Sequence, residues 1–177
     1  MAPHLDGPIS QVPWSPQLLG QSLELLIVGF RDGQIVALRP RHAASLQLGW
    51  RPGVTAAEVL AAAMGRYGLA PRALHSTSWR HDGEHVVLTY LAVVDLGSEV
   101  DANLAVEPVF RAELARGDAT AAPAAIQVDQ VLEHALRHLA WLQAEDPAIG
   151  AALGDWREAL ATYVPEPFRA LGEPRPS

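Results

Sequence analysis

The stretch PGVTAAEVLAAAMGRYGL, residues 52–69, carries both end signals of a helix and decides most of the fold. Thr55 and Glu58 have the spacing of a capping box, in which each side chain accepts a hydrogen bond from the other residue's backbone N–H. Gly68 suits the left-handed residue after a helix end, and Pro71 prevents continuation. The apolar residues recur three and four positions apart and so share one face: Val59, Leu60, Ala63, Met64 and Tyr67. The sequence therefore predicts a helix over 55–67, packed on a sheet.

Two hairpins flank this helix. SLELLIVGF (22–30) and QIVALR (34–39) surround Asp32-Gly33, a pair typical of a two-residue type I′ turn. A short strand is predicted over 46–50. Strands over 73–80 and 84–95 surround a second Asp-Gly pair at 82–83, and VVLTYLAVV (86–94) is apolar enough for a strand covered on both faces.

Two helices are predicted to close the chain, over 129–144 and 149–164. The first has a core stripe of leucines and a second stripe of His134, His138 and Trp141, and the second adds Trp156 and Tyr163. One helix cannot bury two stripes against a single sheet face. We therefore expect a homodimer through these helices, since a twofold dimer is the commonest way to cover such a surface. The alternative is that the last helix folds back over the first within one chain.

Composition limits the function classes. Of 177 residues, 49% are apolar and 19% charged, which is typical of a globular domain. The absence of cysteine excludes disulfides and thiolate sites, and a net charge of −7 argues against nucleic-acid partners. All 13 basic residues are arginine, as in proteins of GC-rich bacterial genomes. We find no membrane span or signal pattern, and expect a cytoplasmic protein with an extended lead-in at 1–17 and one domain over 18–177.

From Leu23 to Asp95 the order of these elements resembles the Nudix hydrolase superfamily. The resemblance implies an α/β (α+β) fold, a mixed sheet sandwiched by helices, with extra C-terminal helices. The family signature, G-x5-E-x7-R-E-U-x-E-E-x-G-U, places glutamates on one helix face to bind Mg²⁺ beside a diphosphate. Aligned on Gly68-Leu69, those positions hold Ala61-Ala62 and Gly65-Arg66; aligned on the helix cap, they hold Ala62-Ala63 and Arg66-Tyr67. The box is degenerate, so we assign no catalytic residue and no metal ligand.

Six residues are candidates for binding a ligand: Arg39, Trp50, Arg51, Glu58, Arg66 and Trp79. Arg66 stands where the resemblance places a metal-binding glutamate, and with Arg39 and Arg51 it could form a pocket for a phosphate or carboxylate. Trp50 and Trp79 could stack on a flat ligand, although tryptophan is more commonly found in the core. The capping box already explains Glu58.

Other clusters have plainer explanations. His75, His81 and His85 surround the second hairpin and could bind a metal with Asp82 or Glu84, but turn-flanking polar residues usually face solvent. His134 and His138 share a helix face without a third ligand at a recognisable spacing.

Three functions remain open. The first is a pseudoenzyme that binds a nucleotide- or phosphate-like ligand, or a protein, and needs no cofactor. The second is a divergent Mg²⁺-dependent hydrolase of a nucleoside diphosphate derivative, with carboxylates relocated to Glu84, Glu99, Asp101 and Glu107. The third is a structural or assembly subunit.

Overall fold

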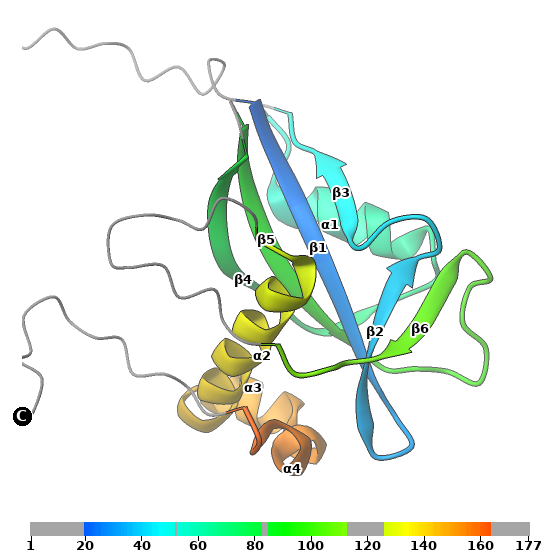
Figure 1. The fold of residues 1–177 in the computed structure, drawn as a ribbon, viewed down its shortest axis with the longest axis vertical. Coiled ribbons are helices and arrows are strands. Elements are labelled where there is room, and N and C mark those ends of the chain that lie inside the picture. Colours follow the sequence, from blue (N-terminus) through cyan, green and yellow to red (C-terminus); the bar gives the residue numbers. More distant parts are fainter. Residues whose placement is uncertain (1–19, 52, 83–84, 113–125, 164–177) are drawn as a thin grey trace, which may run out of the picture.

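The computed structural model describes residues 20–51, 53–82, 85–112 and 126–163, so the lead-in expected over 1–17 lies outside the described residues. Along the chain six strands and several helices follow one another (Figure 1). Within the described ranges, no helix is both long and apolar enough to cross a membrane.

The strands form one mixed sheet. They are β1 (Gly20–Arg31), β2 (Gln34–Pro40), β3 (Leu46–Gly49), β4 (Pro71–Asp82), β5 (His85–Val94) and β6 (Leu104–Pro108). Their order is β4-β5-β1-β2-β6, and β3 pairs with the first half of β1. β1 and β5 run parallel, from Gly20 opposite His85 to Val28 opposite Val93, whereas the other pairs are antiparallel. This arrangement confirms the five predicted strands and adds β6, a short edge strand that pairs with β2.

The first hairpin turn has the predicted conformation. Asp32 and Gly33 have φ angles of 51° and 79°. Positive φ at both central residues is the mark of a type I′ turn, whose twist matches that of the two strands. The second predicted turn includes Gly83, which lies outside the described residues.

Helix α1 (Ala56–Gly65) covers one face of the sheet, as predicted. The Thr55 side chain accepts a hydrogen bond from the backbone N–H of Glu58, and the Glu58 carboxylate accepts one from the backbone N–H of Thr55 at 2.8 Å. At the other end, Gly68 has a φ of +65°, and the N–H of Leu69 donates to the carbonyl of Met64. Three side chains of the helix are buried against the sheet: Leu60, Ala63 and Met64.

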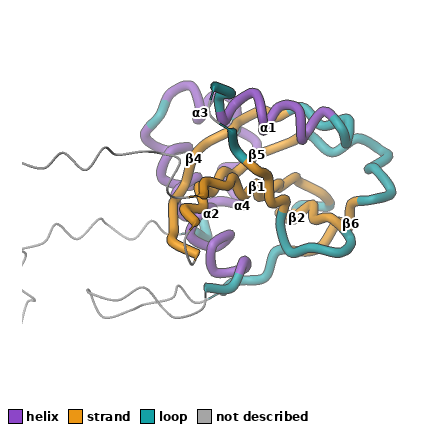
Figure 2. The backbone as a smooth tube through the Cα atoms, turned by 90° about the horizontal axis from the view of Figure 1, so that it is seen from above, coloured by secondary structure: helices purple, strands orange, loops and turns teal. Residues whose placement is uncertain are grey.

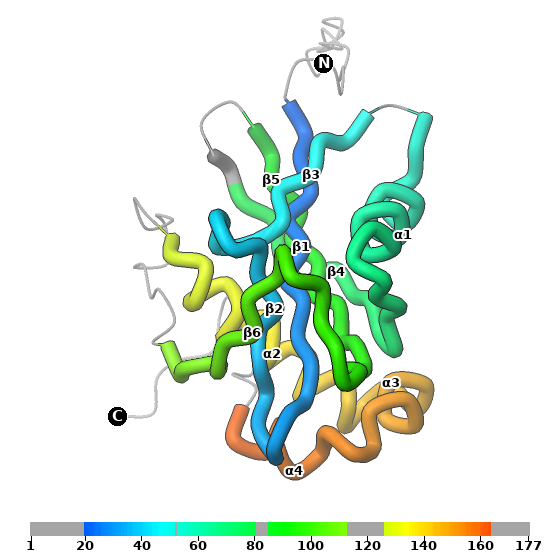
Figure 3. Tube along the Cα trace, turned by 90° about the vertical axis from the view of Figure 1, so that its right-hand side faces the viewer, coloured from blue at the N-terminus to red at the C-terminus, as the bar shows by residue number. Residues whose placement is uncertain are grey.

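Helix α2 (Val128–Glu145) covers the opposite face, so the sheet lies between two helical layers (Figures 2 and 3). Leu132 and Leu136 pack with Leu26 and Val28 of β1, whereas Leu23, Leu25 and Ile27 of β1 pack on the α1 side. β5 contributes Leu91 and Val93 to one core and Ala92 and Val94 to the other. This confirms that the apolar strand is covered on both faces.

The helix predicted over 149–164 is wrong as one element. It is divided into α3 (Pro147–Ala152), a 3-10 turn (Gly154–Trp156) and α4 (Arg157–Leu160). Leu153 leaves the helical region, with φ −119° and ψ 32°. The break turns this segment back onto α2, where Trp156 is 1% exposed and Tyr163 is 5% exposed. The expectation that Trp156 and Tyr163 present apolar surface to a partner is therefore wrong, because both are buried in their own chain.

Candidate functional site

The six predicted binding residues are divided between the two faces of the sheet. Trp50 packs with the α1 core, and its indole N–H donates to the carbonyl of Val54 at 2.6 Å. Arg51 and Arg66 are exposed at the two ends of α1, and Glu58 is held in the capping box. Arg39 instead follows Ile35 and Ala37 on the α2 face of β2. The structure therefore does not bring Arg39 together with Arg51 and Arg66.

Arg39 has partners of its own on the α2 face. Its guanidinium forms an ion pair with Asp129 at the start of α2, and its Nε lies 3.8 Å from the carboxylate of Glu107 on β6. Through these contacts Arg39 of β2 joins β6 and α2, which gives it a structural role. Glu107, one of the carboxylates considered for a hydrolase, is thus on an edge strand and paired with a cation.

Trp79 is not a core residue. It lies on edge strand β4 and is 64% exposed. Its position opposite Leu88 in the ladder places it on the α1 face, whereas Ser78 and Arg80, one position to either side, belong to the α2 face.

Three histidines gather at the seam between β4 and α2, a grouping that the sequence did not predict. The rings of His75 and His138 meet edge to face with centroids 4.9 Å apart, and His138 stacks on Trp141 at 5.7 Å. His134 lies one helical turn before His138. Among the described residues, no group of three or more histidine, aspartate or glutamate side chains has a geometry that could hold a metal ion.

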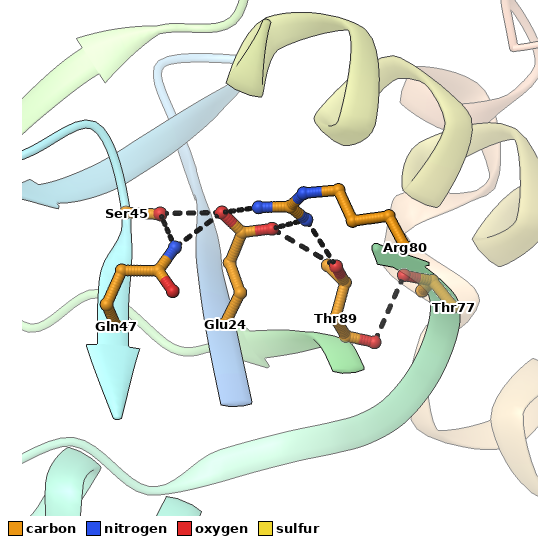
Figure 4. Close-up of polar contacts among 6 residues, drawn as sticks. All are labelled: Glu24, Ser45, Gln47, Thr77, Arg80 and Thr89. Carbon is orange, nitrogen blue, oxygen red and sulfur yellow. Dashed lines mark hydrogen bonds and ion pairs between the residues drawn. The ribbon is translucent and has the colours of Figure 1, made fainter. Parts of the chain in front are cut away.

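A buried carboxylate organises the polar part of the α2 face (Figure 4). Glu24, in the middle of β1, is fully buried and accepts hydrogen bonds from Ser45 at 2.9 Å and Gln47 at 2.8 Å. Thr89, its neighbour on β5, donates at 3.1 Å. Arg80 completes the set through both terminal nitrogens, at 2.5 and 3.0 Å. Four side chains from four segments thus converge on one carboxylate.

These contacts keep Glu24 ionised. Burial by itself would raise the pKa of this carboxyl, because a charge is costly away from water. Hydrogen bonds from Arg80, Ser45 and Thr89 outweigh burial, and the pKa of Glu24 lies below its ordinary value. Near neutral pH Glu24 is therefore ionised and acts as a hydrogen-bond acceptor.

The same contacts leave one edge of Arg80 available. Nη1 donates to Glu24 and to Thr89, and Nη2 uses one of its two hydrogens on Glu24. The Nε–H and the second Nη2 hydrogen have no partner among the residues that the structure describes. They are parallel donors on one side of a planar group, the arrangement that binds a carboxylate or phosphate through two hydrogen bonds.

Arg80 also lines a cleft between β4 and the first half of α2. The cleft has a volume of about 230 Å³. Ser78, Arg80, Gln130 and His134 supply polar groups, Ile126 and Val131 supply apolar walls, and Trp79 also lines the cleft. No carboxylate belongs to this lining in the part of the chain that the structure describes, although the chain as a whole is acidic. The cleft is therefore suited to an anionic or acceptor-rich group.

A second buried carboxylate is structural. Glu133 of α2 accepts hydrogen bonds from Arg111 at 2.7 and 2.9 Å and from Arg137 at 2.8 Å. Burial by itself would raise the pKa of Glu133, but the hydrogen bonds from Arg111 and Arg137 outweigh burial and lower this pKa. Arg111 also donates to the carbonyl of Thr162 at 2.7 Å and lies 4.2 Å from the centre of the Tyr163 ring. It thus joins α2 to the end of the described chain.

Sequence reasoning singled out neither Arg80 of the cleft nor Glu24, the buried carboxylate that holds Arg80. One signal was present: Glu24 is a lone charge within the apolar strand LELLIV, and a charged residue is almost never buried unless it is paired. That signal predicts a cation nearby but does not say which of the 13 arginines supplies it.

Known proteins add little to this description. No protein-family model and no curated protein matches the chain. Among solved structures, the crystal structure of C. elegans Ap4A hydrolase matches with 13% identity and a TM-score of 0.38, over 51% of this chain and 81% of that one. The E. coli ORF135 protein matches with 13% identity and a TM-score of 0.31, over 50% and 69% of the two chains. These likenesses are too loose to transfer a residue or an activity, so the mixed α+β fold rests on the sheet and helices described above.

Proposed function

We propose that the chain is a Nudix-type binding module that holds one carboxylate or phosphate group of a small ligand on the Nε–Nη2 edge of Arg80, without hydrolysing it. One observation carries the proposal: Glu24 and Thr89 fix the guanidinium while two parallel donors remain at a cleft. A side chain that is already ordered loses little conformational freedom on binding, which favours affinity.

The cleft suits the end group of a ligand. Its volume of about 230 Å³ is smaller than the range of about 300–1,000 Å³ typical of sites for whole drug-sized molecules. Ile126 and Val131 offer apolar contact beside the anionic group, and Ser78 adds a hydroxyl. We expect one acidic group and the adjoining part of the ligand to enter, while the rest stays outside.

Two features favour binding over metal-dependent hydrolysis. Ala61, Ala62 and Gly65 occupy signature positions of α1, and Glu58 accepts hydrogen bonds from Thr55 at the helix cap. In addition, α1 packs on the opposite face of the sheet from the cleft. A phosphate held by Arg80 would therefore lie away from the helix that carries the family's metal ligands.

Thermal-shift measurements test the proposal with sulfate, phosphate, nucleotides, sugar nucleotides and polyphosphates, each with and without Mg²⁺. We expect stabilisation that does not depend on the metal. A ligand at one hundred times its dissociation constant stabilises by about 2.7 kcal/mol, which is easily detected. A shift that requires Mg²⁺, accompanied by product formation, would instead support the hydrolase.

Variants locate the site. Arg80→Lys keeps a cation beside Glu24 but cannot present two parallel donors, so the affinity for the ligand should fall by about tenfold or more. Arg157→Gln, an exposed position on α4, is the matched surface control and should leave affinity unchanged. Arg66→Gln tests the site predicted from the sequence. A loss of binding in Arg66→Gln, with Arg80→Lys unaffected, would place the ligand at α1 and overturn the proposal.

A further inference from the structure

The charge of the cleft depends on one histidine. Arg80 contributes a positive charge, but Glu24 lies within hydrogen-bond distance and cancels it. Ser78, Gln130 and the apolar walls are neutral. Among the described residues that line the cleft, His134 is the one histidine, the residue type that changes charge between about pH 5 and 8.

The charged and titratable side chains around His134 have partners of their own. His138, one turn further along α2, packs against His75 of β4 and Trp141 of α2. Partial burial lowers the pKa of His138, and the nearby His75 and His134 lower it further. His138 is therefore harder to protonate than an ordinary histidine. The remaining charges of this part of α2 are paired elsewhere: Asp129 with Arg39, and Glu133 with Arg111 and Arg137.

We propose that binding of a divalent anion in the cleft is coupled to uptake of one proton by His134, so that acidification switches the site from weak to strong binding. This inference rests on the proposed function of the cleft. At neutral pH the Arg80–Glu24 pair offers donors without net charge, which suits a singly charged carboxylate. With His134 protonated the lining gains one positive charge, and a dianion such as a phosphate monoester is favoured.

Sulfate is the probe, because it remains a dianion throughout this range and its own titration does not contribute. Calorimetric titration of the full chain should show about tenfold tighter sulfate binding at about pH 5.5 than at about pH 7.5, within the limit of about tenfold per pH unit that uptake of one proton sets. His134→Gln should bind sulfate with nearly the same affinity at both pH values. His42→Gln, a histidine in the exposed loop after β2, is the control and should keep the wild-type dependence.

The outcomes separate the two proposals. Sulfate binding that needs Arg80 but does not change with pH would overturn the coupling and leave the binding module intact. A pH dependence that survives in His134→Gln would assign it to another group and also refute the coupling. No sulfate binding at either pH would count against both proposals. As a second readout, NMR of the imidazole in the wild type should show sulfate moving the titration of His134 to higher pH, which a purely structural role would not produce.

Discussion

Replacing Glu24 by glutamine tests the buried ion pair most directly. The substitution keeps the size of the side chain but removes its charge, so Arg80 loses the carboxylate that lies 2.5 and 3.0 Å away. Breaking a buried pair by changing one partner costs about 3–5 kcal/mol, because the other charge is left without compensation. The Arg80 side chain retains 21% exposure. Water can therefore solvate part of it, and we expect a loss near 3 kcal/mol.

Urea unfolding followed by tryptophan fluorescence measures this loss, with the slope of the transition unchanged. The double variant Glu24→Met, Arg80→Met supplies the comparison, since replacing both charges by apolar residues is often neutral or stabilising. We expect the double variant to be more stable than Glu24→Gln. A loss below about 1 kcal/mol in Glu24→Gln would mean that the pair contributes no more than an exposed salt bridge, and the reasoning would fail.

The pair also predicts a pH dependence with a definite sign. The pKa of Glu24 is lower in the folded protein than its ordinary value. Its contribution to stability is therefore fully present above the unfolded value of about 4.5 and is lost as the pH falls through the folded value. The stability of Glu24→Gln should decline less steeply than that of the wild type over this acid range, and parallel curves would contradict the assignment.

Leu60 is fully buried between α1, to which it belongs, and the sheet, so Leu60→Ala should lower the free energy of unfolding by about 2–5 kcal/mol. A loss below about 1 kcal/mol in urea unfolding would contradict this packing. Thr55→Ala removes the cap of α1 and should cost about 1 kcal/mol, with Thr55→Ser close to wild type. The pKa of His138 is lowered by burial and by His75 and His134, so protonation of His138 opposes folding. The free energy of unfolding should therefore fall as the pH drops below about 6.5. This decline should be smaller in His138→Phe, and an unchanged decline would exclude His138 as its source. Trp141 is 48% exposed and is available to a second copy of the chain. We expect sedimentation at micromolar concentration to show a dimer, and Trp141→Glu to be a monomer. A monomeric wild type would refute this expectation.

Local signals predicted local structure well. The capping box of Thr55 and Glu58, the stop at Gly68 and the turn at Asp32-Gly33 depend on residues within a few positions of one another, and the structure confirms each of them. The apolar run 86–94 likewise identified the strand covered on both faces. In these cases the sequence pattern itself contains the interaction that determines the conformation.

Long-range pairing could not be predicted in the same way. Glu24 and Arg80 are 56 positions apart, and only the sheet register brings them together. Trp79 is exposed because β4 is an edge strand, which depends on the order of strands and not on the residues around it. The break at Leu153 was missed because Leu153, Trp156 and Leu160 fit one helical stripe, although packing onto α2 divides the segment.

The parallel seam between β1 and β5 has a consequence for how the chain folds. Gly20 pairs with His85 and Val28 with Val93, so each contact along the seam joins residues 65 positions apart, as 85 − 20 and 93 − 28 both show. The β1–β2 and β4–β5 hairpins can each form from neighbouring residues, but joining them must overcome the entropy of closing a long loop, and contacts of this kind slow folding. Glu24 and Thr89 face each other across this seam, and Arg80 arrives with the second hairpin. We therefore expect the Glu24 carboxylate to stay hydrated while the β1–β2 hairpin is separate, and to lose its water in the same step that brings Arg80 to it.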